Sequence, residues 1–459
     1  MKEIPIVVNA AGSMYESAAK IYPREVAGRF QRLRTLAAWI LLGLFYLMPW
    51  LNLGGQQALL FDLPARQFHV LGLHFWPQDF IFLAGLLVLA ALSLFFFTAL
   101  GGRLWCGYAC PQTVWTEVFI ALERFAEGDR GQRIKLDKAP FSLNKLRRKG
   151  LKQFLWIALA AWTGLTFVGF FSPIRDLGLR LLDFNLGGWE SFWICFYGFA
   201  TYGNAGYMRE QVCKYMCPYA RFQSAMFDQD TLVISYDAQR GEKRGPGKKR
   251  EALGDCIDCT MCVQVCPTGI DIRQGLQYEC IACGACIDAC DAVMDKVKLP
   301  RGLIRYSTEH QMSGKPSRIV RPRLLVYAAL LATLIGVMAF GLFERKPLRV
   351  DVLRDRNALY RELGGGDIEN TYTLKIMNKA EKARRFAVSL KAPAGMHLIG
   401  APNEVAVAAR SLLAYPVTVH ADPENLAQQN QIQFVVRALD EPSLERTEES
   451  RFFAPEPRR

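Results

Sequence analysis

The chain has 459 residues, of which 51% are hydrophobic, 12% aromatic and 22% charged, and this mixture excludes a single soluble domain. The formal net charge of +13 suits either nucleic-acid binding or the basic cytoplasmic loops of a membrane protein. Lys and Arg lie mostly in loops that flank apolar runs. The charge therefore favours a protein of the lipid bilayer, and no nucleic-acid partner is expected.

Four apolar segments of about 20 residues are predicted membrane spans. The opening residues, MKEIPIVVNAAGSMYESAAK, lack the apolar core of a signal peptide. A fifth apolar segment, 189–206, includes Glu190 and Asn204, which are costly in hydrocarbon. It predicts a fifth span, with an interfacial or re-entrant segment as the alternative. The four clear spans are residues 35–54, 80–100, 154–173 and 324–343.

The distribution of Lys and Arg predicts how these spans are oriented. Six basic residues lie in 1–34, eleven in 101–152 and seventeen in 207–322, but only one in 55–78 and two in 174–187. With five spans, the three basic stretches face the cytoplasm of a bacterial inner membrane and the C-terminus is periplasmic. Without the fifth span, one basic stretch would lie on the wrong face.

Two copies of a C-x3-C-P motif follow predicted spans, in WCGYACPQ and VCKYMCPYAR. Cysteines at positions i and i+4 share one helix face, and the proline is expected to end or kink that helix. Two matched motifs on one side of the membrane predict a catalytic or metal-binding thiolate site, suited to Cu(I) or to iron–sulfur. Packing cysteines at helix ends are the alternative, and the metal is left open. The site residues are Cys106, Cys110, Cys213 and Cys217.

Eight cysteines between positions 256 and 290 form two copies of C-x2-C-x2-C-x3-C. A cubane needs four converging thiolates, and in two-cluster ferredoxins the fourth ligand comes from the other motif. The spacing therefore predicts two [4Fe–4S] clusters with crossed ligands, because four-thiolate zinc sites rarely repeat this rhythm. One quartet is Cys256, Cys259, Cys262 and Cys290, and the other is Cys266, Cys280, Cys283 and Cys286.

The thirteen cysteines as a group also indicate the compartment. Twelve lie in the clusters described above and only Cys195 stands apart, where packing is the expected role. A secreted disulfide framework would spread its cysteines through small domains. Clustered thiolates instead indicate bound metal in a reducing compartment. The basic stretch GEKRGPGKKR (241–250) before the eight cysteines is expected to be a solvated linker.

From about residue 367 the sequence alternates with a period of two, which predicts short strands. Turn residues separate the runs, and this spacing predicts a β-sandwich of about 100 residues. No cysteine follows Cys290, so a core disulfide is excluded. The predicted strands are 371–376, 385–390, 404–409, 413–419 and 431–437.

The predicted fold class is an α-helical membrane protein of about five spans, with an inserted ferredoxin-like domain and a C-terminal all-β sandwich. The predicted parts are a cytoplasmic N-terminal segment (1–34), a four-helix membrane region (35–206) with a cytoplasmic loop (101–152), a cytoplasmic segment (207–322) with the ferredoxin domain (250–300), a last span (323–343) and a periplasmic sandwich (344–459).

The five histidines exclude one further cofactor. None lies in a predicted span, whereas a membrane b-type haem commonly takes its axial ligands there. His69 and His74 share the first exported loop. A spacing of five places them on opposite faces of a strand, so they are predicted to be a poor ligand pair unless the loop is irregular.

In order and in detail, these motifs resemble those of the cytochrome c oxidase accessory proteins called CcoG, FixG and RdxA. The resemblance covers nearly the whole chain and implies that the C-terminal sandwich is immunoglobulin-like and periplasmic. It is carried by LFDLPARQFHVLGLHFWPQDF (60–80), WCGYACPQTVW, YMREQVCKYMCPYARFQSAM and the double ferredoxin motif.

The resemblance implies a cupric reductase that converts Cu(II) to Cu(I) during assembly of a cbb-type cytochrome c oxidase. The oxidase or its copper-delivery proteins are the expected partners, and the electron donor is unknown. One alternative is a quinol-linked membrane ferredoxin that passes electrons to a respiratory reductase. Another is a scaffold whose sandwich docks an oxidase subunit. The residues implied to carry copper or assist its reduction are Cys106, Cys110, Cys213 and Cys217.

Overall fold

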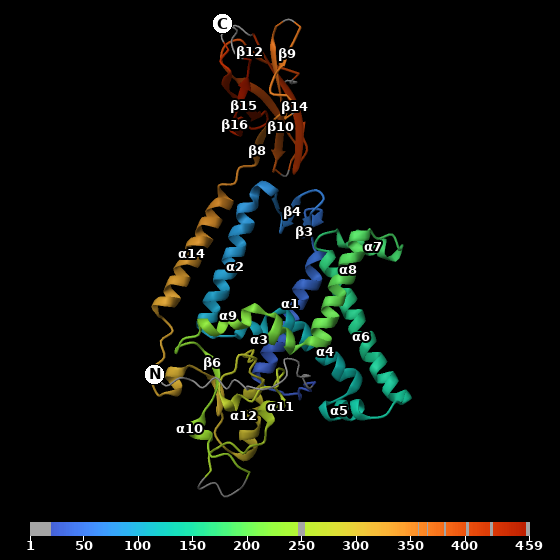
Figure 1. Ribbon diagram of the computed structural model, residues 1–459, viewed down its shortest axis with the longest axis vertical. Coiled ribbons are helices and arrows are strands. Elements are labelled where there is room, and N and C mark those ends of the chain that lie inside the picture. The colour runs from blue at the N-terminus through green and yellow to red at the C-terminus, as the bar shows by residue number, and fades with distance from the viewer. Residues whose placement is uncertain are drawn as a thin grey trace. The chain divides into compact units, whose positions relative to one another are not determined.

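The computed structural model describes residues 20–246, 253–356, 358–364, 366–380, 382–400, 404–422 and 426–455. Most of the predicted N-terminal segment, before residue 20, and residues 247–250 of the predicted basic linker lie outside the described residues. The chain divides into two compact units, Met1–Ile335 and Gly336–Arg459 (Figure 1).

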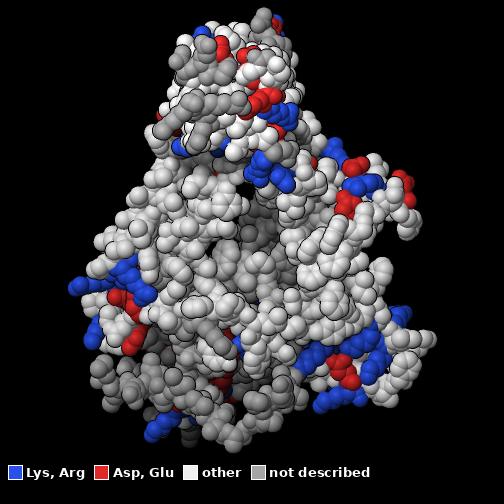
Figure 2. All heavy atoms as spheres, turned by 45° about the horizontal axis from the view of Figure 1, so that its top comes forward, with Lys and Arg blue, Asp and Glu red and all other residues white. Residues whose placement is uncertain are grey.

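Among the described residues, four helices are long and apolar enough to cross a membrane, and each overlaps one of the four clear predicted spans. No residue in the most apolar window of α2 is buried, as expected for a helix surrounded by lipid. Figure 2 shows charged side chains gathered in separate groups, with broad uncharged surface between them. The helices are α1 (Arg29–Leu47), α2 (Phe80–Gly101), α6 (Leu143–Val168) and α14 (Pro322–Phe343).

Helix α6 begins and ends earlier than the predicted span. Its N-terminus is capped by Ser142, whose Oγ accepts a hydrogen bond from the backbone N–H of Lys145 at 3.2 Å. The helix ends at Gly169, and Pro173 precedes the short helix α7 (Ile174–Leu182). The apolar run covered only the second half of α6, whereas capping chemistry set its start.

The fifth predicted span is divided between two kinds of helix. An α-helix, α8 (Gly188–Thr201), continues directly into a π-helix at Tyr202–Met208. Helix α8 packs closely on α6, where a Cβ on Gly164 would lie 2.3 Å from the carbonyl oxygen of Ile194. Small residues at such a crossing are typical of helices that pack within a membrane. The segment is helical as expected, and its crossing of the membrane stays a prediction.

The costly acidic residue of this segment has charged and polar partners. Glu190 lies in the first turn of α8 and pairs with the Arg180 guanidinium through two contacts of 2.8 Å. The hydroxyl of Ser172 donates to the same carboxylate at 2.9 Å. A paired carboxylate at a helix end costs much less than an isolated one in hydrocarbon.

A small antiparallel sheet lies between α1 and α2. It contains β3 (Leu59–Asp62), β4 (Gln67–Val70) and β5 (Leu73–Phe75). The turn between β4 and β5 places His69 directly opposite His74, with their Nδ1 atoms in contact. The spacing argument placed both residues on one strand, so it missed the hairpin that brings them together. Shorter elements nearby are η1 (Met48–Trp50), β1 (Asn52–Leu53), β2 (Gln56–Gln57) and η2 (Pro77–Asp79).

The cysteine-rich insert is closed by a pair of strands from its two ends. β6 (Val233–Tyr236) pairs antiparallel with β7 (Ile304–Ser307), and the insert core packs between them and α12. Elements outside the long helices are α3 (Leu104–Tyr108), α4 (Pro111–Glu127), α5 (Arg130–Lys138), η4 (Val212–Met216), α9 (Pro218–Met226), α10 (Ala238–Gly241), α11 (Met261–Gln264), η5 (Ile272–Gln274), α12 (Ala285–Val297) and α13 (Glu309–Met312).

The insert is joined to the membrane helix α1 by one carboxylate. Asp288 of α12 accepts hydrogen bonds from the backbone N–H groups of Phe30 and Gln31, at 3.2 and 2.8 Å. These N–H groups belong to the first turn of α1, where they lack partners within the helix. A Cβ on Gly28 would lie 2.1 Å from Asp288 Cγ, so only glycine allows this approach. The insert therefore fixes the start of a membrane span.

The C-terminal unit is a sandwich of two antiparallel sheets, as predicted. One sheet has the order β12-β14-β10-β8 with β9 paired to β10, and the other has the order β13-β11-β15-β16. Four of the five predicted runs lie within strands, and the run 404–409 contains the shorter strand β13. The strands are β8 (Leu348–Arg354), β9 (Arg361–Glu362), β10 (Ile368–Asn378), β11 (Arg384–Lys391), β12 (Met396–Ile399), β13 (Val405–Val407), β14 (Ser411–Ala421), β15 (Gln429–Ala438) and β16 (Glu445–Phe453).

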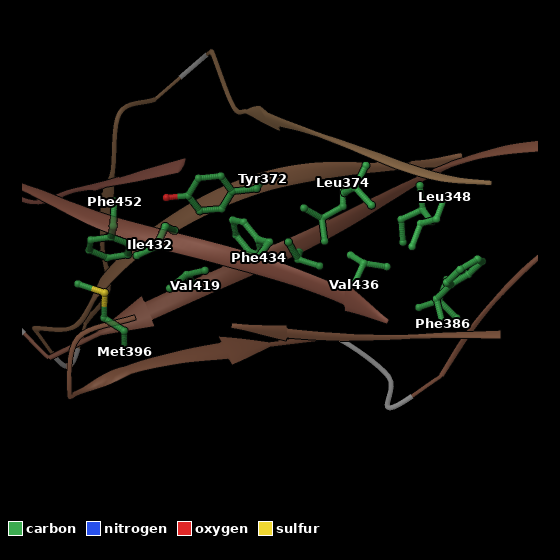
Figure 3. Close-up of a cluster of buried hydrophobic side chains, with 14 of the residues drawn as sticks. Leu348, Tyr372, Leu374, Phe386, Met396, Val419, Ile432, Phe434, Val436 and Phe452 are labelled. Atoms are coloured by element: carbon green, nitrogen blue, oxygen red, sulfur yellow. The ribbon is translucent and has the colours of Figure 1, made fainter. Parts of the chain in front are cut away.

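The sandwich core lies between the inner faces of the two sheets (Figure 3). Tyr372 of β10 and Phe434 of β15 pack edge to face across it, with ring centroids 5.1 Å apart. The buried Tyr372 hydroxyl donates to the carbonyl oxygen of Arg451 at 2.9 Å. Burial of alternate residues along each strand is what stabilises such a sandwich without a disulfide.

Candidate functional site

The first predicted quartet lines a single cavity in the insert. Cys256, Cys259, Cys262 and Cys290 all line this cavity, and Cys290 reaches it from α12. The other walls are mostly apolar. Four thiols around one apolar cavity are what a cubane requires.

The second quartet lines another cavity, whose walls include Cys266, Cys280, Cys283 and Cys286 together with Cys262 of the first quartet. Cys266 comes from the first sequence motif, so the structure brings the cysteines together in the crossed arrangement that the spacing predicts. No three His, Cys, Asp or Glu side chains among the described residues converge closely enough to hold a single metal ion. A cubane spreads its ligands over four irons, so these quartets fit a cluster better than a zinc ion.

The two tight cysteine loops share an unusual backbone conformation. Asp258 and Thr260 flank Cys259 with φ of 53° and 55°, and Ala282 and Gly284 flank Cys283 with φ of 51° and 75°. Left-handed residues on both sides of a cysteine turn the chain sharply around it. Each loop then enters a helix, α11 or α12, whose first turn carries the third cysteine of its triplet. The repeated geometry supports equivalent roles for the two loops.

Burial keeps most of these thiols in the protonated form until metal replaces the proton. It raises the pKa of Cys262 to about 11 and the pKa of Cys280 and Cys290 to about 12. Burial also raises the pKa of Cys283 and of Cys286. Loading of these sites with iron therefore releases protons.

The two C-x3-C-P motifs have the same local structure, which differs from the single helix face that was predicted. In each, the first cysteine lies in a short helix and the second adopts an extended conformation before a proline that starts the next helix. Proline disfavours a helical conformation in the preceding residue and is well suited to the first position of a helix. The helix ends before the proline, as predicted, but the predicted shared helix face was wrong because the second cysteine lies outside that helix and the proline begins a new one. The extended residues are Cys110 and Cys217.

The first C-x3-C-P motif packs directly on the second cysteine loop of the insert. Cys106 packs against the small core that includes Ile281 and Cys283. A Cβ on Gly107 would lie 2.6 Å from the carbonyl oxygen of Ile281 and 3.0 Å from Cys283 Cα, so only glycine fits. The hydroxyl of Tyr108 donates to the carbonyl oxygen of Cys283 at 3.2 Å. This contact joins the thiolate motif to the second quartet.

A buried arginine lies where both motifs and the insert meet. Arg103 donates to the carbonyl oxygen of Cys280 at 3.4 Å and to that of Ala220 at 2.5 Å. Burial lowers the pKa of this guanidinium, and the nearby thiols of Cys106, Cys280 and Cys213 act in the opposite direction. The charge of Arg103 therefore favours thiolate at positions where burial disfavours it.

The two C-x3-C-P motifs also contact each other. Gln112 donates to the carbonyl oxygens of Asn204 and Arg209, at 2.9 and 3.1 Å, and so links α4 to the segment that leads to Cys213. Burial raises the pKa of Cys213 to about 11, and the neighbouring Cys110 raises it further. The four cysteines are neighbours, although no three of them converge as ligands of one ion among the described residues.

A buried ion network holds the second motif, and sequence reasoning missed it. Glu123 of α4 is fully buried and pairs with Arg209 at 2.8 Å, Lys20 at 3.1 Å and Arg133 at 3.4 Å. Burial alone would raise the pKa of Glu123, but Arg209 and Lys20 outweigh it and lower the pKa to about 2. The only sequence signal for this network was the position of Glu123 in the strongly basic segment 101–152. Its partners are far apart in the sequence, so spacing could not identify them.

Three family models match the chain. A 4Fe-4S dicluster domain matches residues 208–309, a 4Fe-4S binding domain matches residues 83–126, and the IG-like fold at the C-terminal of FixG matches residues 338–455. The first match includes both quartets and the second C-x3-C-P motif, and the second match includes the other motif. These matches support iron–sulfur clusters in the insert and an immunoglobulin-like C-terminal domain.

Three curated proteins are similar over most of their length. The nitrogen fixation protein FixG of Rhizobium meliloti is 40% identical over 84% of this chain and 82% of its own length. Protein RdxB of Cereibacter sphaeroides is 40% identical over 90% of this chain and 88% of its own. Protein RdxA of the same organism is 41% identical over 83% and 84%.

Proposed function

Because this chain belongs to the FixG/RdxA family of membrane iron–sulfur electron-transfer proteins, we propose that it reduces Cu(II) to Cu(I) during assembly of a cbb-type cytochrome c oxidase. The observation that carries the proposal is the packing of the Cys106 motif on the Cys280–Cys283 loop. A soft thiolate pair thus lies beside a site for a one-electron cofactor. When bound, the [4Fe–4S] clusters supply one-electron transfer.

Copper is the substrate in this proposal, and the C-x3-C-P thiols are the groups that bind it. Each Cu(II) gains one electron and becomes Cu(I), the ion that thiolates prefer. Burial raises the pKa of Cys106 to about 12, so copper binding there releases a proton. Arg103 favours the deprotonated sulfur from its buried position between the motif and the insert.

The proposed arrangement places the insert in the cytoplasm of a bacterial inner membrane and the sandwich in the periplasm. The support is the concentration of Lys and Arg in segments 101–152 and 207–322. The sandwich would then be free to contact the oxidase or its copper-delivery proteins on the exported side. A reporter fused after residue 455 tests this orientation by its periplasmic activity.

The proposed function is tested with anaerobically purified protein whose clusters are reduced by dithionite, and the excess dithionite is then removed by gel filtration, because it reduces Cu(II) directly. Cu(II) is then added, and Cu(I) is followed with a chromophoric chelator. Cys110→Ser and Cys217→Ser are expected to slow Cu(I) formation strongly. The matched control is Cys195→Ser, because Cys195 is an exposed free thiol on α8. Unchanged rates in both motif variants would remove the role assigned to these thiols.

A further inference from the structure

A cavity of about 710 Å³ runs along one face of the membrane helix α1. Its lining residues recur every three or four positions, including Gln31, Arg34, Ala38, Leu42 and Tyr46. The stretch from residue 31 to residue 47 spans roughly 24 Å at the rise of an α-helix. The opposite wall is formed by α4. Because the lining follows α1 over this length, the cavity is an elongated groove and not a compact pocket.

The groove has one polar end with an available donor. Arg34 is only 6% exposed and pairs with Glu117 at 2.9 Å, and Gln31 donates to the other oxygen of this carboxylate at 2.9 Å. Among the described residues, Nε of Arg34 has no hydrogen-bond partner. A buried donor without a partner costs free energy unless a ligand accepts from it.

The same cavity touches the second quartet. Val265 and Pro267 line it, and they flank Cys266 in the sequence. Ala285, another lining residue, directly precedes Cys286. The contact is held in place by Asp288, which caps the start of α1 from the insert helix. A molecule in the groove would therefore lie against the wall of an iron–sulfur site.

We propose that this groove binds an isoprenoid hydroquinone, with its ring at Arg34 and Glu117 and its tail along α1. This inference rests on the proposed function, because copper reduction needs a source of electrons. The hydroquinone loses two electrons and two protons and becomes the quinone. The electrons reduce the two [4Fe–4S] clusters by one electron each, and the protons leave through Glu117 and cytoplasmic water.

The charges at the polar end favour a neutral ring over a phospholipid headgroup. The Arg34 guanidinium is paired with Glu117, and Arg124 is paired with Glu25 at 2.6 Å. A phosphate would add a negative charge next to these two carboxylates, whereas a hydroxyl or carbonyl oxygen needs only the single donor that Arg34 offers. The long apolar wall suits a prenyl chain.

Binding is measured with the whole protein in nanodiscs, loaded with its clusters under anaerobic conditions. The probes are decylubiquinone and an azido-substituted quinone that labels its surroundings in light. Labelled peptides are expected from α1 and α4. Gly43→Trp fills the groove, because a Cβ at Gly43 meets no atom within 4 Å. It should weaken decylubiquinone binding about tenfold or more.

The matched control is Gly336→Trp on α14, where a Cβ also meets no atom within 4 Å. It adds the same side chain to a lipid-facing helix and should leave quinone binding unchanged. Iron content shows that each variant retains its fold. Ala121→Trp, which enters the groove from α4, replaces Gly43→Trp if that variant fails to fold.

The outcomes separate this inference from the proposed function. Absence of saturable binding, labelling outside α1 and α4, or equal binding by both tryptophan variants would overturn the hydroquinone site. Phospholipid retained in place of the quinone would overturn it as well. If dithionite drives Cu(II) reduction but decylubiquinol does not reduce the clusters, only the inference fails. If decylubiquinol reduces the clusters but Cu(II) is not reduced, only the copper proposal fails.

Discussion

The cysteine-rich insert and the paired C-x3-C-P motifs both use closely spaced cysteines, but they assemble their sulfurs differently. In the insert, left-handed residues wrap each loop, and two quartets each surround a cavity. In the paired motifs, the first cysteine lies in a short helix and the second is extended before the next helix, and a buried ion network holds the second motif. The insert cysteines thus line two cavities, whereas the C-x3-C-P cysteines lie where a short helix gives way to the next one.

The largest expected effect tests the crossed ligands of the insert. Cys256→Ser with Cys290→Ser removes two ligands from one quartet, so one intact [4Fe–4S] cluster with about four irons should remain. Cys256→Ser with Cys266→Ser removes one ligand from each quartet, so no intact [4Fe–4S] signal should remain. Iron analysis and EPR of the reduced proteins measure both. The reverse pattern would show that each sequence motif holds its own cluster.

The next effect tests whether the ion network holds the second C-x3-C-P motif. Glu123→Gln leaves Arg209 and Arg133 without their buried anion and should destabilise the protein by about 3 kcal/mol. Because the folded state lowers the pKa of Glu123 to about 2, its carboxylate stabilises the protein above about pH 4.5 and loses this effect as pH falls toward 2. Thermal unfolding across this range should be less pH-dependent in the variant.

The matched control is Glu441→Gln, which breaks an exposed pair with Arg384. It should leave thermal unfolding unchanged. The comparison also predicts that Glu123→Gln keeps its iron, because the insert does not depend on the network. If the Glu123→Gln variant lost its iron, the insert would not be independent of the ion network.

A smaller effect tests the contact between the two regions. Gly107→Ala places a Cβ 2.6 Å from a backbone carbonyl oxygen and should cost about 1–3 kcal/mol by pushing the motif away from the insert. Dithionite-driven Cu(II) reduction should slow, and iron content should not change. Gly131→Ala on α5, where a Cβ meets no atom within 4 Å, serves as the control. Equal reduction rates in the two variants would show that the contact is not part of the electron route.

The smallest effect concerns the sandwich, which lies outside the proposed electron route. Tyr372→Phe removes the hydrogen bond to Arg451 and should lower the stability of this domain by about 1 kcal/mol. Faster hydrogen exchange of β15 and β16 amides in the full chain would show it. Cu(II) reduction and iron content should match the unmodified protein, and a slower reduction would give the sandwich a role in electron transfer.

The parts of the molecule that were predictable from the sequence depend on local periodicity. Apolar runs identified four long helices, alternation identified five strands of the sandwich, and cysteine spacing identified quartets that prove to line two cavities. In each of these cases, the residues that carry the pattern lie within one helix, one strand or two neighbouring loops.

The parts that were missed depend on contacts between distant segments or on a local turn. The hairpin that joins His69 to His74 depends on a turn at Gly72, and the buried partners of Glu123 come from segments up to 103 residues away. The groove along α1 forms only when α4 and the insert pack against it. No spacing rule within a single segment reports such contacts.

Iron content of the anaerobically purified protein tests the central distinction between the insert and the C-x3-C-P motifs most directly. The measurement compares the unmodified chain with a variant in which Cys106, Cys110, Cys213 and Cys217 are all serine. The account predicts about eight irons per chain in both proteins, because the two quartets of the insert hold all the clusters. About twelve irons falling to about eight in the variant would place a third cluster on the motifs and contradict it.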